Sequence, residues 1–330
     1  MDKILEVRDF SIAYKTQDGV ARALNHVNLT LGEGMTLGLV GETGAGKTTL
    51  AKGIMRLIPS PPGSRESGTV FYRGNDIYQM SDEELRKIHG KEISMVFQDP
   101  MTSLNPVLTV GEQIAEAVSA HQDIPASKAM GVACRMLELV GIPSSRAQEY
   151  PHQFSGGMKQ RVVIAIALAC DPRVLIADEP TTALDVTIQA QVLEMMKALQ
   201  TKLNTAMLLI THDLGVVAQN CDHVAVIYAG EVVEYGTVFE IFDTMLHPYT
   251  HGLIHSIPSL NRDVRRLKPI DGMMPDPMCL PEGCSFSPRC PFAREKCRAE
   301  HPQLMPVEGE HSVRCFFPQK SFFFEGGVRP

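Results

Sequence analysis

The stretch Gly41-Glu42-Thr43-Gly44-Ala45-Gly46-Lys47-Thr48-Thr49 decides the fold. It fits the pattern G-x-x-x-x-G-K-[ST], in which backbone N–H groups close on nucleotide phosphates, the lysine meets the β- and γ-phosphates, and a hydroxyl holds Mg²⁺. An apolar run at 36–40 predicts a buried strand before the loop, and residues 49–58 have apolar side chains at helical spacing. A helix in this place directs its positive dipole end at the phosphates. The sequence therefore predicts a nucleotide-binding loop rather than an ordinary glycine-rich turn.

The composition indicates a globular protein with more than one domain. The chain has 330 residues, of which 44% are hydrophobic and 21% charged, so we expect one large domain and one smaller one. A net charge of −7 argues against nucleic acid as a partner, which normally requires a basic surface. We find neither an apolar run long enough to span a bilayer nor the layout of a signal peptide. We therefore expect a cytoplasmic protein whose link to a membrane runs through a partner.

Two alternating segments near the N-terminus predict antiparallel strands. Residues 4–14 and 27–31 alternate apolar and polar side chains, as strands with one buried face do. Residues 59–68 are rich in Pro, Gly and Ser and predict a loop, which a strand at 69–72 follows. Tyr14 ends the first strand and has two interpretations, ordinary packing within the sheet or stacking on an adenine ring.

A helical block interrupts the α/β pattern. Ser81 and Glu84 have the spacing of a capping box at the start of a helix. From 110 to 140 the pattern is mostly helical, with a break near Pro125 and an end at Gly141. This block predicts an inserted helical subdomain.

Predicted buried strands end on polar residues that suit phosphate chemistry. One run ends on Gln98, the next on Asp178 and Glu179, and a third on His212. The carboxyl ends of parallel strands share one crevice with the phosphate loop. An aspartate at such a strand end holds Mg²⁺ opposite the hydroxyl of the loop, here Thr48. We therefore expect these side chains to lie together around the nucleotide.

The motifs, in this order and spacing, resemble the ATP-binding subunit of an ABC transporter. The signature Ser155-Gly156-Gly157-Met158-Lys159-Gln160 carries the resemblance, because it belongs to ABC ATPases and stands just before the strand that ends on Asp178. The match extends over residues 4–255. Phe154 departs from the leucine of many members, which affects packing more than chemistry.

The resemblance implies a fold and a division into domains. It implies an α/β fold with a P-loop (RecA-like) core, an antiparallel β subdomain, and an inserted helical subdomain at about 101–170. The ATPase domain would occupy 1–255. Residues 256–330 would form a small C-terminal extension stabilised by a metal.

The resemblance also implies the roles of single residues. Tyr14 would stack on adenine, and Lys47, Gln98, Glu179 and His212 would act in catalysis, with Glu179 as general base. Thr48, Gln98 and Asp178 would hold Mg²⁺. The residues that would hold the triphosphate are Gly41, Glu42, Thr43, Gly44, Ala45, Gly46, Lys47, Thr48 and Thr49. Ser155, Gly156 and Gly157 would complete the ATP site of a second ATPase subunit, so that the two chains form a heterodimer.

A narrower resemblance indicates the transported solute. Residues 247–258 are similar to the extension of oligopeptide and dipeptide importer ATPases, and segments 96–106 and 181–187 fit the same branch. This implies an ATPase at the cytoplasmic face of the membrane, with two permease subunits as partners and an extracellular solute-binding protein as an indirect one. Nickel, glutathione or another small solute is the alternative cargo. An ABC ATPase that acts outside transport is the alternative class.

Five cysteines gather near the C-terminus. Cys284, Cys290, Cys297 and Cys315 match the extension of that branch, and Cys279 is an alternate. Four thiolates suit tetrahedral zinc or an iron–sulfur cluster, and the C-x₂-C spacing common in zinc sites does not occur here. Some members of the branch carry a 4Fe-4S cluster on these cysteines, so the resemblance ranks the cluster ahead of zinc, and zinc ahead of free thiols.

Overall fold

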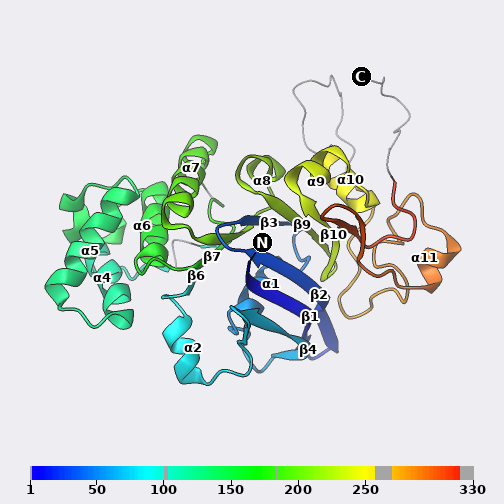
Figure 1. Cartoon of the computed structure of the whole chain (residues 1–330), viewed down its shortest axis with the longest axis horizontal. Helices are drawn as coiled ribbons and strands as arrows, with labels where there is room; N and C mark the ends of the chain where they lie inside the picture. Colours follow the sequence, from blue (N-terminus) through cyan, green and yellow to red (C-terminus); the bar gives the residue numbers. More distant parts are fainter. Residues whose placement is uncertain (1, 100–102, 183, 257–269, 320–330) are drawn as a thin grey trace.

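The structure is a computed structural model that describes residues 2–99, 103–182, 184–256 and 270–319. Residues 100–102 of the segment 96–106 and residue 183 of the segment 181–187 lie outside the described residues. Residues 257–269, near the start of the predicted C-terminal extension, also lie outside them. Figure 1 shows two sheets in the middle of the molecule and a helical group at one end. The C-terminal segment, residues 270–319, lies at the other end.

The first sheet is antiparallel and has the strand order β2-β1-β4-β5. Its strands are β1 (Lys3–Lys15), β2 (Val20–Gly32), β4 (Gly63–Tyr72) and β5 (Asn75–Asp76). The loop predicted at 59–68 is wrong from Gly63 onward, because this part pairs with β1, where Ser64 faces Ala13. Backbone pairing with a long neighbouring strand here outweighs the low strand propensity of Gly and Ser.

The second sheet has the strand order β11-β12-β10-β9-β3-β8-β7-β6. Its five strands from β9 to β6 run parallel, and β10, β12 and β11 complete it in antiparallel fashion. The strands are β3 (Thr36–Val40), β6 (Ile93–Val96), β7 (Val174–Asp178), β8 (Ala206–Ile210), β9 (His223–Tyr228), β10 (Glu231–Thr237), β11 (Met305–Glu308) and β12 (His311–Val313). Two strands of the C-terminal segment thus extend the main sheet.

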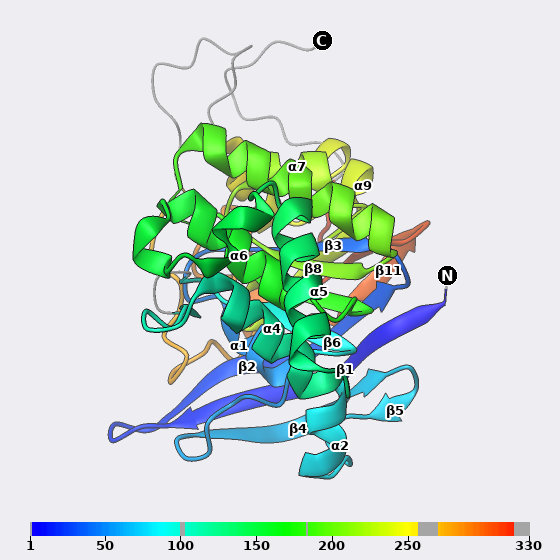
Figure 2. The same ribbon diagram turned by 90° about the vertical axis from the view of Figure 1, so that its left-hand side faces the viewer.

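Both faces of the five parallel strands are buried, which explains their continuous apolar runs. Along β7, Val174 and Ile176 point into the core shared with the antiparallel sheet, whereas Leu175 and Ala177 point into the core shared with the helices. In Figure 2 the antiparallel sheet lies below the main sheet and α7 lies above it. The predicted buried strands at 36–40 and from 174 to Asp178 are confirmed. The runs predicted to end on Gln98 and His212 are strands too, but they end at Val96 and Ile210, so the two polar residues follow their strands.

The helices lie between and beside these strands. Their bounds are α1 (Lys47–Ile54), α2 (Asp82–Ile88), α4 (Val110–His121), α5 (Ala126–Leu139), α6 (Gly156–Leu168), α7 (Val186–Leu203), α8 (Leu214–Asn220), α9 (Val238–Asp243), α10 (Pro248–His255) and α11 (Glu295–Ala299). Short 3-10 turns at Ser144–Gln148 and Pro151–Gln153 precede α6. The predicted helical insertion is confirmed as α4 and α5, which Figure 1 shows at one end of the molecule.

Candidate functional site: the nucleotide edge of the main sheet

The predicted phosphate loop connects β3 to α1. A Cβ on Gly41 would lie 2.2 Å from the carbonyl oxygen of Ile227, so only glycine fits there. Gly46 precedes α1 with a φ of 105°, which is the left-handed region that glycine adopts without strain. Lys47 Nζ donates to the carbonyl oxygens of Gly41, at 2.8 Å, and Glu42, at 3.1 Å. Burial lowers the pKa of Lys47 although carboxylates nearby raise it, and an anionic phosphate would favour its charged form.

Asp178 is the last residue of β7 and is 1% exposed. Burial raises its pKa, and a hydrogen bond with the Thr48 side chain opposes that rise. Its Oδ1 atom is buried and has no hydrogen-bond partner among the described residues. An unsatisfied carboxylate oxygen beside a hydroxyl group is a donor set that suits Mg²⁺. The residues present at this point therefore fit the ion.

Glu179 lies at the centre of a polar cluster. Its Oε2 accepts hydrogen bonds from Gln98 Nε2, at 3.1 Å, and from the Thr182 hydroxyl, at 2.8 Å. Its Oε1 lies 3.5 Å from Nδ1 of His212, a side chain that is 63% exposed. The structure thus brings together the three side chains that the sequence placed at different strand ends. The backbone of Glu179 has a φ of 48°, an uncommon value for a residue with a side chain.

The register of the parallel strands explains this convergence. Asp178 pairs with Ile210, and Leu39 on the other side pairs with the same Ile210. The residues that follow these positions therefore leave the sheet side by side at its carboxyl edge. Thr182 was not predicted as part of this cluster. It lies three residues after Glu179 in a turn, in which its N–H donates to the Glu179 carbonyl at 3.2 Å.

Tyr14 lies near the end of β1, opposite Ala21 on one neighbouring strand and Gly63 on the other. Its ring is half-buried and packs against the core beneath the antiparallel sheet. A Cβ on Gly63 would lie 3.0 Å from this ring. Sheet packing therefore occurs, and stacking on adenine stays a prediction.

The signature residues lie at the start of α6. Ser155 is the N-cap residue, and its hydroxyl accepts a hydrogen bond from Met158 N at 3.4 Å. Ser155 and Gly156 are exposed, and Gly157 is half-buried against Ile188. No acidic residue lies in the first turn of α6, so the free N–H groups and the dipole of this helix are available to an anion. In Figure 1, α6 lies with α4, α5 and α7, to one side of α1.

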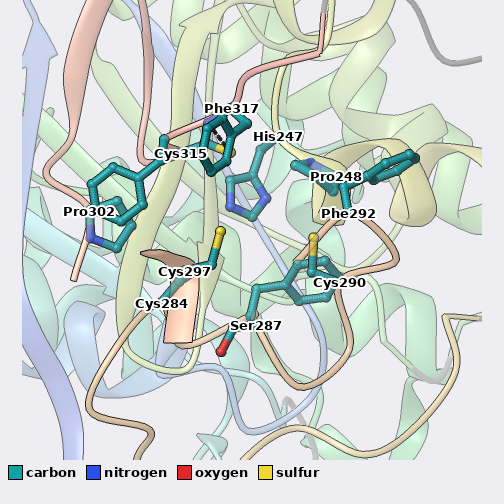
Figure 3. A pocket seen from close by; sticks show the side chains of 12 residues that line it. His247, Pro248, Cys284, Ser287, Cys290, Phe292, Cys297, Pro302, Cys315 and Phe317 are labelled. Atoms are coloured by element: carbon teal, nitrogen blue, oxygen red, sulfur yellow. Dashed lines mark hydrogen bonds between the residues drawn. The ribbon is translucent and has the colours of Figure 1, made fainter. Parts of the chain in front are cut away.

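A second candidate site lies in the C-terminal segment. A small cavity of about 20 Å³ is lined by four cysteines, together with His247 and several aromatic rings. The cysteines are Cys284, Cys290, Cys297 and Cys315, and Figure 3 shows their side chains around this space with the His247 ring between them. The alternate, Cys279, is exposed and does not line the cavity.

The cavity does not show a closed metal site. Within the part of the chain that the structure describes, no group of three or more His, Cys, Asp or Glu side chains is arranged to hold a metal ion. Four thiolates on one zinc ion would bring the sulfur atoms to roughly 3.8 Å of one another, given Zn–S bonds of about 2.3 Å. Burial raises the pKa of the Cys284 thiol to about 11 and that of Cys315 to about 12, so both carry protons unless a metal displaces them. The expected metal-stabilised extension is therefore not confirmed.

Solved structures define the class of protein to which this fold and site correspond. A dimeric ATP-binding cassette, MJ0796, in a post-hydrolysis state bound to ADP and Pi, matches with a TM-score of 0.64 and 28% identity, covering 71% of this chain and 98% of that chain. CbiO1 from Clostridium perfringens, part of the ABC transporter complex CbiONQ, matches with a TM-score of 0.63 and 28% identity, covering 73% of this chain and 91% of its own. The fold is that of an ABC ATPase cassette.

Sequence comparisons define the branch. The ABC transporter family matches residues 24–182, and the C-terminal region of oligopeptide/dipeptide transporters matches residues 233–297. The oligopeptide transport ATP-binding protein OppD of Bacillus subtilis is 49% identical, over 94% of this chain and 88% of its own. The dipeptide transport ATP-binding protein DppD of the same organism is 47% identical, over 96% of this chain and 95% of its own. The chain belongs to the ATP-binding subunits of ABC transporters, in their oligopeptide/dipeptide branch. None of the helices that the structure describes has the length and apolarity needed to cross a membrane.

Proposed function

We propose that this chain hydrolyses ATP to drive the import of dipeptides and oligopeptides through membrane permease subunits. The observation that supports ATP hydrolysis most directly is the cluster of Gln98, Glu179 and His212 at the carboxyl edge of the sheet, next to the phosphate loop. The relatives named for oligopeptide and dipeptide transport support the cargo. Nickel and glutathione are the alternative solutes within the same ATPase role.

The arrangement of side chains supports a separate role for each residue in ATP hydrolysis. Lys47 leaves the loop carbonyls and binds the β- and γ-phosphates, where its charge offsets theirs. Glu179 accepts the proton of the water that attacks the γ-phosphorus, and the bond to the β-phosphate oxygen breaks. Gln98 and Thr182 hold Glu179 Oε2, which leaves Oε1 for the water. His212 donates to the γ-phosphate.

Mg²⁺ fits beside Thr48 and Asp178, where it would neutralise part of the phosphate charge. Asp178 Oδ1 has the free lone pairs for this role, directly or through water. Gln98 is the third residue that we assign to the ion. Tyr14 stacks on the adenine, and the remaining loop residues from Gly41 to Thr49 bind the phosphates through backbone N–H groups.

The site is half of a shared one. Ser155, Gly156 and Gly157 start a helix whose N-terminus carries no carboxylate, and we assign them to the ATP of a second ATPase subunit of different sequence. We place the assembly at the cytoplasmic face of the membrane, beneath two permeases that receive solute from an extracellular binding protein. The boundary at residue 255 between ATPase domain and extension also belongs to this proposal.

A 4Fe-4S cluster on Cys284, Cys290, Cys297 and Cys315 is the finer part of the proposal. Each thiolate of such a cluster binds a different iron, so the sulfurs surround a common volume rather than one point, and the four cysteines do line one cavity. Protein purified without oxygen should contain about four irons and absorb broadly near 400 nm. Cys290→Ser should abolish both signals and Cys279→Ser should not. Colourless protein that contains stoichiometric zinc would contradict the iron–sulfur cluster and would indicate a zinc site instead.

Reconstitution with the two permeases, the sister ATPase and the binding protein in vesicles tests the main proposal. We expect uptake of labelled dipeptide or oligopeptide that depends on ATP and stops with Lys47→Ala. ATP-driven uptake of nickel or glutathione, without peptide uptake, would replace the cargo and keep the ATPase. The chain alone should hydrolyse ATP poorly, and full turnover by a monomer would contradict the shared site.

A further inference from the structure

The C-terminal segment contacts the phosphate loop through an ion pair with Glu42. Arg289 Nη1 donates to Glu42 Oε2 at 2.8 Å, and Nη2 donates to Oε1 at 3.1 Å. The Arg289 side chain is only 5% exposed and that of Glu42 is 29% exposed. This is a bidentate, largely buried ion pair, the geometry in which an arginine–carboxylate contact is most specific. The two residues are separated by 247 positions in the chain.

Every N–H group of the Arg289 guanidinium donates a hydrogen bond. Besides Glu42, it donates to the carbonyl oxygens of Asp271, at 3.0 Å, and Ile270, at 3.2 Å, and to the Tyr228 hydroxyl at 3.4 Å. Five N–H donors thus meet five acceptors. Lysine has three donors without the planar fork, so it cannot reproduce this set. Arg289 therefore fixes the loop relative to both the main sheet and the start of the C-terminal segment.

Tyr249 holds the same loop residue from a second direction. Its hydroxyl accepts a hydrogen bond from the backbone N–H of Glu42 at 2.9 Å, and its side chain is fully buried. The Glu42 carbonyl in turn accepts from Lys47 Nζ. The backbone N–H, the carboxylate and the carbonyl of Glu42 are therefore all engaged, and the position of Glu42 determines where Lys47 rests before it meets a phosphate.

Both contacts lead back to the cysteine-lined cavity. Cys290, which lines the cavity, directly follows Arg289. Phe286, another lining residue, has its ring centroid 5.5 Å from that of Tyr249. A change in the cavity that moves these two lining residues therefore moves the two side chains that hold Glu42.

We propose that Arg289 and Tyr249 are positioning residues for the phosphate loop, and that through them the cysteine-lined cavity sets the affinity for ATP. The inference rests on the proposed role of the loop in ATP binding. Both residues contact the phosphate loop at Glu42, and both act through it. By thermodynamic linkage, a change at the cavity that weakens ATP binding is itself opposed by bound ATP to the same extent.

Binding of a fluorescent ATP analogue to the full chain tests the positioning role. Arg289→Lys keeps the charge and loses the fork, and we expect about tenfold weaker binding, as for the loss of a hydrogen bond to a charged group. Glu42→Gln should have a similar effect, and the double variant should bind no worse than either single one. Arg298→Gln, next to Cys297 on the exposed surface, is the matched control and should bind like wild type.

The same assay separates positioning from mere structural support. If Arg289 served only stability, Arg289→Lys would lower the temperature of thermal unfolding while the folded protein bound ATP with unchanged affinity. Independent, additive losses in the double variant would also overturn the proposal. Tyr249→Phe removes only the hydroxyl, and we expect severalfold weaker binding without loss of the fold.

The link to the cavity has its own test. Cys290→Ser should weaken ATP binding by about as much as Arg289→Lys, and in the Arg289→Lys background it should add less than twofold. If Cys290→Ser weakened ATP binding as much in the Arg289→Lys background as in wild type, the link would be refuted. It would also be refuted if Cys290→Ser left ATP binding by the otherwise wild-type chain unchanged. If wild type itself binds no ATP, the proposed function fails; if wild type binds and all these variants bind equally, only this inference fails.

Discussion

Two glutamates at opposite parts of the main sheet are used in contrasting ways. Glu179, at the carboxyl edge of the sheet beside the phosphate loop (the nucleotide edge), is 15% exposed and receives side-chain hydrogen bonds on Oε2 alone. Glu234, on β10, is 0% exposed and receives three hydrogen bonds, from Leu246 N at 2.6 Å, His247 N at 3.0 Å and His311 Nε2 at 2.8 Å. The first carboxylate has one oxygen without a side-chain hydrogen bond, whereas both oxygens of the second accept hydrogen bonds within the fold.

This difference reflects what each region must do. The nucleotide edge is open because phosphates and water have to enter it, so its polar groups are left partly unsatisfied. The C-terminal segment has few apolar runs of its own, so buried polar contacts tie it to β10. Arg314 adds to them by donating to the carbonyl oxygen of Val232 on β10, at 3.0 Å. It also donates to the carbonyl oxygen of Pro302 within the segment, at 3.2 Å. We therefore propose that the charge at the first site serves turnover, whereas the charge at the second serves stability.

Glu179→Gln should show the largest effect on turnover. The amide cannot take a proton from water, so we expect ATP hydrolysis by the paired complex to fall by about 10²- to 10⁴-fold, the usual contribution of a general base. ATP binding should persist, and the free energy of unfolding should change by less than about 1 kcal/mol. Phosphate release and fluorescent-nucleotide binding measure the two properties.

Glu194→Gln is the control for this prediction, because Glu194 is an exposed carboxylate on α7, the helix that follows the nucleotide edge. It should leave turnover unchanged. If Glu179→Gln hydrolysed ATP at the wild-type rate, Glu179 would not be the base and the cluster around it would be structural, like that around Glu234.

Glu234→Gln should show the reverse pattern. Removing the charge weakens three buried hydrogen bonds, and we expect the free energy of unfolding to fall by about 3 kcal/mol, measured by urea denaturation. Glu310→Gln is the control, because its partner is also a histidine, His223, but its side chain is 60% exposed. Water reaches the Glu310 carboxylate although His223 is buried, so we expect this variant to lose only about 1 kcal/mol. If Glu234→Gln and Glu310→Gln lowered the free energy of unfolding equally, the buried hydrogen bonds of Glu234 would not make it more important for stability than an exposed carboxylate.

Sequence reasoning located most of the nucleotide edge, because local patterns encode it. A strand, a glycine-rich turn and a helix are contiguous, and the parallel order of the strands places their ends together whatever the intervening loops do. Gln98, Glu179 and His212 meet for that reason. Thr182 was not predicted, because a hydroxyl in a turn gives no periodic signal.

The contacts of the C-terminal segment could not be predicted in this way. Arg289 and Glu42 are 247 residues apart in the chain, and no sequence pattern around either residue indicates that the two form an ion pair. The resemblance to the branch indicated Cys284, Cys290, Cys297 and Cys315, and these four line one cavity, but the spacing of the cysteines fixes neither the distances between their sulfur atoms nor the metal. The start of β4 was missed because its residues are poor strand formers that pair with a strong neighbour.

The smallest expected effect compares two serines that cap helices. Ser81 caps α2 in a complete capping box with Glu84, whereas Ser155 caps α6 without a carboxylate in the first turn. Replacing either by alanine should cost about 1 kcal/mol of stability, which chemical denaturation measures. Only Ser155→Ala should also lower ATP turnover of the paired complex, by about tenfold, because only that helix start is left free for a phosphate. A loss of turnover in both variants, or in neither, would mean that the bare start of α6 is an incomplete cap and not half of a nucleotide site.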